Sequence, residues 1–594
     1  MTSYVIAGAG PAGLYTAYRL LSANVLQTGD TLQLIEWSDA HVGGRIHTYY
    51  FEGGDANGQY VEAGGMRFST DPNFPNSIQS GHIVLQNLIV AMNLQGSVVP
   101  FVMSNPQRLY YLRGVNFYEQ NIPSITLPYQ FDASFTANGY QKQTAEAIFG
   151  DLAANFTQTT QSWTRSQWCD YFAGGVIPAQ AATATFPAGM PIQNVGYWNL
   201  LYDQLGDEGF DYVTDANGFT SNTINWNSAD AMQSNTEFGD DSVYSRIQGG
   251  YSLLFQALAS EVSNLGMSLQ GQDPIVMATQ LAGFEYDPSG NQFTLTLVDA
   301  NGAATTTCDR LFLAMPRRSL ELVAAGSSAA NPLNQEAVKF YIESSLDQPA
   351  YKVAMLFDDP WWSDTGICAF PPNLTDGAGG PTMTDLPLRQ IYYFGNDAPG
   401  ATGGGRYVLL ASYDDMQFAS FWQEMEITGD RTGPASMDYQ PLNGPTALDP
   451  ASPMVTMLLS QLALVHGANV ADIPAPTQAI FQDWGRNPYG AGYHGWAAHY
   501  NICEAMEAIR WPGAIVGDNA MALFIVGSCY SIDQAWVEGA LCTAESVLQQ
   551  YFGLAPFAGV PQGYTLICSA DGAGGGLMGM AAATGEGDTE PAGT

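Results

Sequence analysis

The pattern of apolar and polar positions at the start of the chain predicts a strand, a helix and a second strand. The apolar run "SYVIAGAG" begins at Ser3 and has the length and composition of a buried strand. The next segment, "PAGLYTAYRLLS", places Leu14, Tyr18 and Leu21 at helical spacing. The segment "DTLQLIEW" then predicts a second strand, which ends in Glu36. The pattern indicates a strand–helix–strand unit.

Three glycines, Gly8, Gly10 and Gly13, lie in the turn between the first strand and the helix. They suit a tight turn, a close approach of the backbone to a pyrophosphate, and close packing of the helix on the strand. The helix N-terminus adds the positive end of its dipole. Glu36, 23 residues beyond Gly13, is placed to accept both hydroxyls of a ribose. The pattern predicts a dinucleotide site rather than a purely structural turn, and Glu36 argues against a 2′-phosphate, which leaves NAD or FAD.

Length and composition predict a folded protein of more than one subdomain. With 594 residues, the chain exceeds the roughly 250–300 residues at which single cores stop growing. Apolar residues make up 46% of the chain and charged residues 12%, which is unlike a disordered protein. The formal charge of -38 opposes the phosphate neutralisation that drives nucleic-acid binding. We therefore expect a generally acidic surface and no nucleic-acid partner.

The cysteines and histidines predict neither a disulfide framework nor a metal site. The seven cysteines are scattered without a C-x-x-C pair, and the six histidines show no metal-binding spacing. We therefore expect an organic cofactor and no metal. The first predicted strand leaves no room for a secretory leader, and no apolar run approaches the ~20 residues that span a bilayer. These features predict a soluble, cytoplasmic protein without a membrane partner.

Two further glycine motifs follow the predicted unit. Residues Gly43–Arg45 read G-G-R, seven positions after Glu36, and residues Gly64–Arg67 read G-G-M-R. In this order the motifs resemble the flavin amine oxidases, and the G-x-M-R resembles the L-amino-acid oxidase branch in particular. Other segments resemble the family in the family's own order; they are 244–258, 308–320, 351–362, 483–496 and 523–544.

The resemblance implies a mixed α/β fold with three parts: a Rossmann-like FAD-binding domain of the glutathione-reductase type, a mixed-sheet substrate domain and a helical insertion. The implied ranges are 1–69, 246–330 and 505–553 for the FAD-binding domain, 70–135 and 331–504 for the substrate-binding domain, and 136–245 for the insertion. No motif identifies substrate-facing residues within the insertion. The Gly/Ala-rich segment 570–594 has no apolar period, and we expect a flexible tail there.

The resemblance also implies a cofactor site, with Arg45 close to the pyrophosphate of FAD. Gly492 stands where some monoamine oxidases carry the cysteine that attaches FAD, so a non-covalent flavin is implied; Cys529 is an alternative tether or simply a small buried residue. After Gly527 the family commonly has an acid that contacts the ribityl chain, whereas this chain has Ser528, which can still form a hydrogen bond. The residues implied in cofactor binding are Gly8, Gly10, Pro11, Ala12, Gly13, Glu36, Gly44, Arg45, Gly64, Gly65, Met66, Arg67, Gly527, Ser528, Ala535, Trp536 and Val537.

Arg67 and Lys352 are the cations that the resemblance places at the substrate. A guanidinium at Arg67 can grip an α-carboxylate through two parallel hydrogen bonds, and the alternative is a structural salt bridge. Lys352 matches a family lysine that holds a water against flavin N5. The alternative, a solvated lysine at a strand end, fits poorly with the buried-strand pattern "YKVAMLF".

Aromatic residues complete the implied substrate site. Trp536 matches the aromatic wall beside the flavin, and the backbone carbonyl of Ala535 could accept a hydrogen bond from the substrate amine. Tyr493 is the aromatic residue expected to face this wall. Tyr413 is expected as a second carboxylate ligand, with Ser412 or plain strand packing as alternatives.

The resemblance as a whole implies an FAD-dependent L-amino-acid oxidase. Such an enzyme converts an L-α-amino acid and oxygen into a 2-oxo acid, ammonia and hydrogen peroxide by hydride transfer from Cα to flavin N5, and a homo-oligomer is the family expectation. An amino-acid 2-monooxygenase, which forms an amide, and a mono- or polyamine oxidase stay open, as does a non-catalytic flavoprotein. The acidic surface favours cationic substrates and the aromatic residues favour aromatic ones, so the sequence does not select a side chain.

Overall fold

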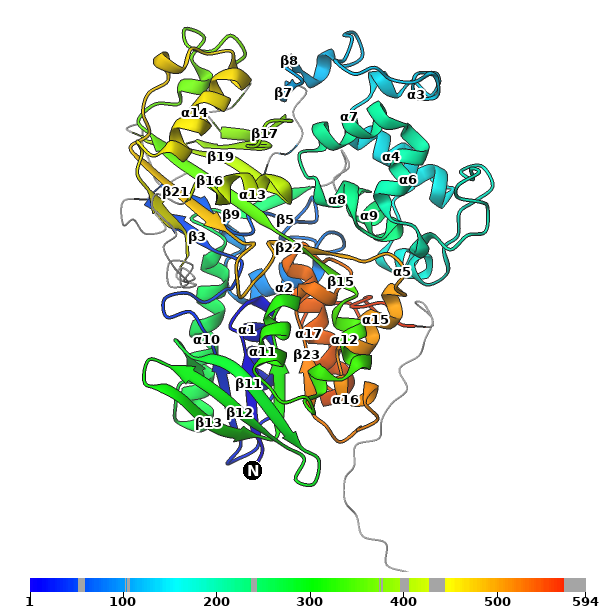
Figure 1. Cartoon of the computed structure of the whole chain (residues 1–594). Helices are drawn as coiled ribbons and strands as arrows, with labels where there is room; N and C mark the ends of the chain where they lie inside the picture. Colours follow the sequence, from blue (N-terminus) through cyan, green and yellow to red (C-terminus); the bar gives the residue numbers. More distant parts are fainter. Residues whose placement is uncertain are drawn as a thin grey trace, which may run out of the picture.

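The computed structural model describes residues 1–51, 59–101, 103, 107–236, 243–372, 374, 378–395, 405–426 and 444–570. A parallel sheet, a large mixed sheet and a group of helices make up most of this part of the chain. In the view of Figure 1 the parallel sheet lies in the lower half, the mixed sheet lies at the upper left and the helical group at the upper right.

The strand–helix–strand unit expected from the apolar pattern forms the middle of the parallel sheet. β1 (Ser3–Ala7), α1 (Pro11–Ser22) and β2 (Thr31–Ile35) follow one another as predicted. The strand order is β10-β2-β1-β14-β23, with β10 at Ile275–Val276, β14 at Arg310–Leu313 and β23 at Leu523–Ile525. Every neighbouring pair is parallel, so the carboxyl ends of the strands meet at the edge where α1 begins. The helices α10 (Ser252–Gln270) and α17 (Val537–Phe552) pack against α1.

The mixed sheet has eight strands, in the order β20-β21-β16-β19-β18-β17-β7-β8. Its central strand β16 (Ala350–Phe357) is buried at every position, as the apolar pattern of this segment predicts. The helices α13 (Gln417–Gln423) and α14 (Pro453–His466) cover the sheet. The other strands are β7 (Leu109–Leu112), β8 (Val115–Tyr118), β17 (Ala378–Thr384), β18 (Gln390–Gly395), β19 (Tyr407–Asp415), β20 (Thr446–Leu448) and β21 (Gln478–Asp483).

The helical group lies between residues 133 and 236 and packs through apolar faces. In α4 (Ala145–Thr157), Ile148, Phe149, Leu152 and Phe156 are buried at helical spacing, and the hydroxyl of Thr144 caps the helix by accepting the N–H of Ala147. The other members are α3 (Ala133–Ala137), α5 (Arg165–Gly174), α6 (Tyr197–Leu205), α7 (Asp207–Asn217), α8 (Ser221–Ile224) and α9 (Ser228–Thr236). This arrangement confirms the expected mixed α/β fold, while the exact domain boundaries stay predictions.

Shorter elements connect these parts. A three-stranded antiparallel sheet, β11-β12-β13, packs against α11. These connecting elements are β3 (Thr48–Tyr50), β4 (Tyr60–Glu62), β5 (Phe68–Ser69), α2 (Ile83–Ala91), β6 (Val98–Pro100), β9 (Tyr244–Ile247), β11 (Gln280–Asp287), β12 (Gln292–Asp299), β13 (Gly302–Cys308), α11 (Arg317–Ala325), α12 (Glu336–Ile342), β15 (Ser345–Gln348), β22 (Tyr493–Trp496), α15 (Ile502–Ile509) and α16 (Pro512–Ile515).

One disulfide is present, although the scattered cysteines did not predict a disulfide framework. Cys169 in α5 is bonded to Cys568, at a sequence separation of 399 residues. No spacing rule detects such a pair, because only the folded chain brings the two positions together. Apart from Ala570, the predicted flexible tail 570–594 lies outside the described residues.

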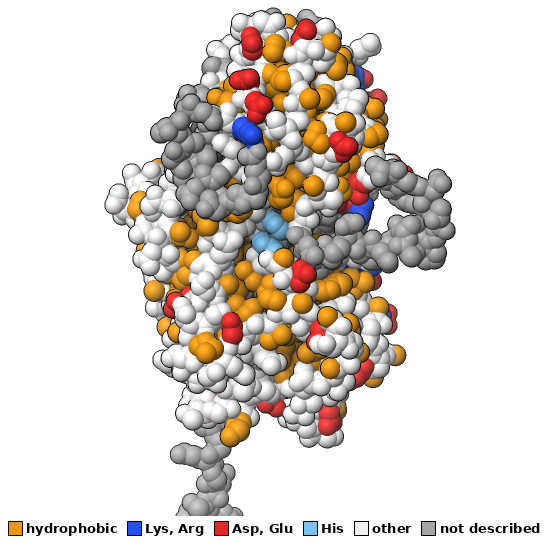
Figure 2. Space-filling model, turned by 90° about the vertical axis from the view of Figure 1, so that its left-hand side faces the viewer, with side chains coloured by type: hydrophobic (Ala, Val, Ile, Leu, Met, Phe, Trp, Pro, Cys, Tyr) orange, Lys and Arg blue, Asp and Glu red, His pale blue; other side chains and the backbone are white. Residues whose placement is uncertain are grey.

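Among the described residues, no helix combines the length and the apolar character that a membrane crossing requires. On the face shown in Figure 2, Asp and Glu side chains are scattered among apolar ones and Lys and Arg are few. The distribution on this face agrees with the acidic surface expected from composition.

Candidate active site

Two adjoining cavities lie where the parallel sheet meets the mixed sheet and the helical group. The first has an empty volume of about 1270 Å³ and follows the turn between β1 and α1. The second has an empty volume of about 810 Å³ and lies between β16, β22 and the helical group. Arg45, Gly65, Gly492, Ala535 and Trp536 line both cavities, so the two spaces are continuous at these residues.

Most of the predicted cofactor residues line the first cavity. They are Gly8, Gly10, Pro11, Ala12, Glu36, Gly44, Arg45, Gly65, Gly527, Ser528, Ala535, Trp536 and Val537. Gly64, Met66 and Arg67 line the second cavity instead. Gly13 lines neither, because a Cβ there would lie 1.9 Å from the carbonyl oxygen of Gly8 and the residue serves close packing within the turn.

The glycine turn is shaped to admit a ligand against its backbone. Gly8 has a φ of +106°, and a Cβ at this position would lie 2.5 Å from the carbonyl oxygen of Ala314. Gly10 caps α1 without any side chain, and Pro11 follows at the first helical position. The N–H groups of the first turn are therefore not occupied by a side-chain cap, which suits an anion.

Glu36 is held at the end of β2 by backbone donors. Its Oε2 accepts the N–H of Ala9 at 2.7 Å, and its Oε1 accepts the N–H of Ser38 at 2.8 Å. Burial raises the pKa of this carboxyl above its ordinary value. The side chain thus lines the first cavity in a fixed orientation, at the position expected for a ribose contact.

Arg45 is a half-buried cation whose hydrogen-bond partners in the described chain include no carboxylate. Its guanidinium donates to the carbonyl of Gly492 at 3.1 Å and lies 3.4 Å from both Nδ1 of His494 and Oγ of Ser528. Burial lowers the pKa of this group. A half-buried guanidinium with no bonded carboxylate among the described residues fits an anionic ligand such as a pyrophosphate.

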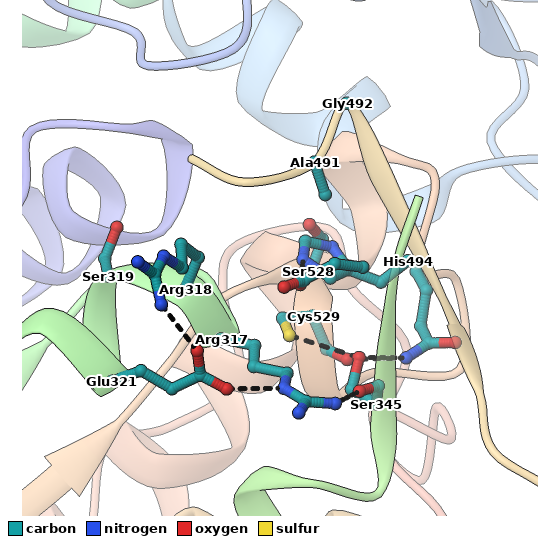
Figure 3. A network of polar contacts seen from close by, with 12 residues as sticks. Arg317, Arg318, Ser319, Glu321, Ser345, Ala491, Gly492, His494, Ser528 and Cys529 are labelled. Carbon is teal, nitrogen blue, oxygen red and sulfur yellow. Dashed lines mark hydrogen bonds and ion pairs between the residues drawn. The ribbon is translucent and has the colours of Figure 1, made fainter. Parts of the chain in front are cut away.

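Figure 3 shows the polar network beside Ser528 and Cys529. Both residues line the first cavity. The thiol of Cys529 donates to Oγ of Ser345 at 3.3 Å, and Nε2 of His494 lies 3.3 Å from a carboxylate oxygen of Asp347. Burial raises the pKa of the Cys529 thiol, but the neighbouring imidazole of His494 brings it below its ordinary value. Cys529 is therefore a buried residue with polar contacts rather than a plain apolar one.

Arg67 enters the second cavity through a group of aromatic rings. Its side chain is buried, and its guanidinium carbon lies 5.6 Å from the ring centres of Phe101 and Tyr244, 5.8 Å from that of Trp536 and 6.0 Å from that of Tyr392. The rings restrict the positions open to the guanidinium and attract its charge. A cation is thus held beside Trp536, at the junction of the two cavities.

Lys352 is buried, so the solvated strand-end alternative is wrong. Its Nζ donates to the carbonyls of Glu62 at 3.1 Å and Gly64 at 2.5 Å, and lies 4.4 Å from the ring centre of Tyr413. Burial lowers the pKa of the amine to about 7. The amine can therefore exchange a proton near neutral pH beside the cavity.

Tyr413, rather than Ser412, lines the second cavity. Ser412 is fully buried on the other face of β19, where its hydroxyl donates to Asp414 at 2.7 Å. Tyr413 and Tyr493 both make edge contacts with Phe219, at 5.3 and 6.0 Å between ring centres. The structure thus brings all six predicted substrate-site residues to one cavity; they are Arg67, Lys352, Tyr413, Tyr493, Ala535 and Trp536.

The helical group forms the outer wall of the second cavity, and no sequence motif identified these wall residues. Its residues are Phe219, Ser221, Asn222, Trp226 and Ser234. They follow no spacing rule, because they enter from a loop and two short helices whose positions depend on tertiary packing. In the first cavity, sequence reasoning likewise missed Trp37, Thr279, Gln280, Leu281, Met315, Ser319, Tyr489 and Gln534.

Comparison with known proteins agrees with this geometry. The family model described as flavin containing amine oxidoreductase matches residues 11–426. The chain belongs to this family. As a family member it is an oxidoreductase that uses a flavin and acts on small-molecule amines with oxygen, as the motifs led us to expect.

Curated relatives of this amine oxidoreductase are similar over nearly the whole chain. Aplysianin-A from Aplysia kurodai is 25% identical over 92% of this chain and 89% of its own length. L-amino-acid oxidase 4 from Hebeloma cylindrosporum is 23% identical over 94% of this chain and 83% of its own length. Among solved structures, putrescine oxidase bound to putrescine superposes with a TM-score of 0.58 at 15% identity, covering 93% of this chain and 99% of that one. The last comparison supports the fold.

Proposed function

We propose that this protein is an FAD-dependent L-amino-acid oxidase, which converts an L-α-amino acid, oxygen and water into a 2-oxo acid, ammonia and hydrogen peroxide. The observation that carries the proposal is the buried guanidinium of Arg67 in the second cavity, next to the aromatic wall of Trp536. A planar fork of this kind binds a carboxylate through two charge-assisted hydrogen bonds. An amine substrate without a carboxylate has no anionic group for the Arg67 guanidinium to bind.

The first cavity suits FAD bound without a covalent link. Gly8 and Gly10 line this cavity without side chains, and Glu36 lines it where a ribose contact is proposed. The guanidinium of Arg45, which bonds no carboxylate among the described residues, is proposed to contact the pyrophosphate. Gly492 offers no side chain for attachment. FAD, when bound, would supply the electron acceptor for the oxidation of the Cα–N bond.

The residues of the second cavity have separate roles in this proposal. Arg67 holds the α-carboxylate, with the hydroxyl of Tyr413 as a second ligand, and the carbonyl of Ala535 accepts from the substrate amine. Trp536 and Tyr493 confine the substrate between two aromatic faces and keep bulk water out. Lys352, with its pKa near 7, holds a water that can hydrolyse the imino acid and can pass a proton to it.

The Arg67→Ala variant tests the proposal. Losing a paired, charge-assisted contact lowers kcat/KM for the preferred L-amino acid about a hundredfold or more, because about 3 kcal/mol of binding is lost. Peroxide production with a panel of L-amino acids and with putrescine measures the effect. Unchanged kcat/KM in the variant, or higher activity of the wild type on putrescine than on any amino acid, would favour a mono- or polyamine oxidase. Mass spectrometry of the product distinguishes a 2-oxo acid from the amide of a monooxygenase.

The disulfide bears on the location of the protein. Disulfides persist in oxidising compartments and are rare in a reducing cytoplasm, so the Cys169–Cys568 pair favours an oxidising compartment over the cytoplasmic location expected above. A homo-oligomer, as in the family expectation, is part of the same proposal. Size-exclusion chromatography with light scattering measures the assembly.

A further inference from the structure

A buried carboxylate, Asp415, joins three parts of the substrate cavity. It is the last residue of β19 and has no exposed surface. Its Oδ1 accepts the N–H of Thr220 at 2.9 Å, and its Oδ2 accepts the N–H of Ser221 at 3.0 Å. The hydroxyl of Tyr493 donates to the same Oδ2 at 2.6 Å. One side chain of the mixed sheet is therefore bonded both to the start of α8 and to β22.

The three partners of Asp415 require a group that only accepts hydrogen bonds. Two N–H groups and one O–H group converge on its two oxygens, and these oxygens offer acceptor sites for all three. The hydroxyl of Ser221 lies 2.7 Å from that of Tyr493. Because the Tyr493 proton points to Asp415, the Ser221 hydroxyl donates to the Tyr493 oxygen. These bonds close a ring that links Ser221, Tyr493 and Asp415.

Gln390, the first residue of β18, and Arg389, which precedes it, bond the same part of the helical group. Nε2 of Gln390 donates to the carbonyl of Gly218 at 3.1 Å, and Arg389 donates to the carbonyl of Thr214 at 2.6 Å. The end of α7 and the start of α8 are thus tied to the mixed sheet. Asp415 differs from these two because it also bonds Tyr493, an aromatic residue of the cavity wall.

The segment that Asp415 holds is the one that carries side chains into the substrate cavity. Phe219, Ser221 and Asn222 line the cavity, and Phe219 contacts the rings of Tyr413 and Tyr493. The separation between this wall and Tyr493 therefore depends on the bonds to Asp415. Figure 1 shows α8 at the border between the helical group and the sheets.

We propose that Asp415 is a positioning residue for substrate binding: it fixes the Phe219–Asn222 wall against the Tyr493 ring and so sets the affinity of the cavity without touching the ligand. This inference rests on the proposed function in that the cavity is taken as the amino-acid site. Loss of Asp415 loosens the wall, whereas Arg67 and Lys352 keep their own contacts. The expected signature is a change in binding with little change in chemistry.

The Asp415→Asn variant of the full chain with its flavin tests the inference. The amide turns an N–H donor toward at least one of the three donors, so at least one of the bonds that hold the wall is lost. We expect KM for the preferred L-amino acid to rise about tenfold or more while kcat stays within about threefold. The Kd of benzoate, a carboxylate with no reactive α-hydrogen, rises by a similar factor when it is followed through the flavin absorbance.

The adjacent Asp414 provides a matched control. It is equally buried on the same strand, but its carboxylate accepts from Ser412 rather than from α8 or Tyr493. Burial raises its pKa well above the ordinary value, so asparagine resembles its protonated form. We expect Asp414→Asn to leave KM and benzoate Kd unchanged. Tyr493→Phe gives a smaller rise than Asp415→Asn, and the two effects combine less than additively because they break the same bonds.

Each outcome of this experiment separates the two proposals. Unchanged KM and benzoate Kd in Asp415→Asn, with only a lower Tm, would show a purely structural role and overturn the inference. If that variant does not fold, Tyr493→Phe and Ser221→Ala carry the test, and normal affinity in both overturns it. A third outcome is that the wild type oxidises no L-amino acid but binds benzoate, and that Asp415→Asn binds benzoate more weakly than the wild type. In that case the proposed function fails while the positioning role stands.

Discussion

At the residue scale, the buried amine of Lys352 makes stability depend on pH. Burial lowers its pKa to about 7 from 10.5 in the unfolded chain, so between these values the unfolded state binds one more proton than the folded state. Stability therefore rises with pH through this window, by up to about 1.4 kcal/mol per unit from this group. Below pH 7 the folded protein must bury the charged form, and the contribution is at its lowest.

The Lys352→Met variant removes this dependence. We expect the free energy of unfolding of the flavin-free protein, measured by urea denaturation at pH 7, 8 and 9, to rise less steeply with pH in the variant than in the wild type. If Lys352 has the proposed role, reoxidation of the reduced flavin by oxygen also slows in the variant, because the amine proposed to hold a water is lost. The exposed Lys339 on α12 is the control, and Lys339→Met keeps the wild-type slope. Parallel slopes in wild type and Lys352→Met would contradict the assignment.

At the scale of elements, the packing of α1 on the β1 turn depends on a residue without a side chain. A Cβ at Gly13 would lie 1.9 Å from the carbonyl oxygen of Gly8 and 3.1 Å from the Cβ of Ala314. Gly13→Ala therefore pushes α1 away from the turn, and we expect the purified protein to lose most of its flavin. The ratio of the flavin absorbance at about 450 nm to the protein absorbance at about 280 nm measures this loss.

Substitution of Gly150, where a Cβ would meet no neighbouring atom, tests whether the flavin loss is specific to Gly13. Gly150 lies inside α4, and a Cβ there meets nothing within 4 Å. Gly150→Ala keeps its flavin and gains about 0.5–1 kcal/mol of stability, because alanine favours the helix. Full flavin retention in Gly13→Ala would mean that the turn tolerates a displaced helix.

The same elements show how far sequence reasoning reaches. The strand, glycine turn and helix from Ser3 to Ser22 were predictable because local periodicity and turn chemistry agree there. The burial of Lys352 was predictable because the residue interrupts an otherwise apolar strand, and its role in the site stays a prediction. Phe219, Trp226 and Asp415 were not predictable, since their roles arise from contacts between the helical group and the sheets, and no periodicity encodes such contacts. The disulfide between Cys169 and Cys568, which are 399 residues apart, was not predictable for the same reason.

At the scale of the whole molecule, the helical group is fastened to the segments that follow β23. Arg165 at the start of α5 donates to Asp533 at 2.7 Å and to the carbonyl of Thr565 at 2.8 Å. Cys169, one turn further along α5, is bonded to Cys568. The ion pair thus holds the group that forms the outer wall of the substrate cavity against the segment that leads into α17, and the disulfide holds it against the segment that follows α17.

Thiol counting and denaturation test this fastening. We expect the unreduced, denatured protein to show five thiols and the reduced protein seven, because Cys308, Cys368, Cys503, Cys529 and Cys542 are free. Cys568→Ser lowers the free energy of unfolding by about 2–4 kcal/mol, since the long loop is no longer closed in the unfolded chain. A reductant lowers the stability of the wild type toward that of Cys568→Ser and leaves the variant unchanged. Cys308→Ala, which removes a free buried thiol, keeps the wild-type response to reductant, and seven thiols in the unreduced wild type would show that the pair does not form.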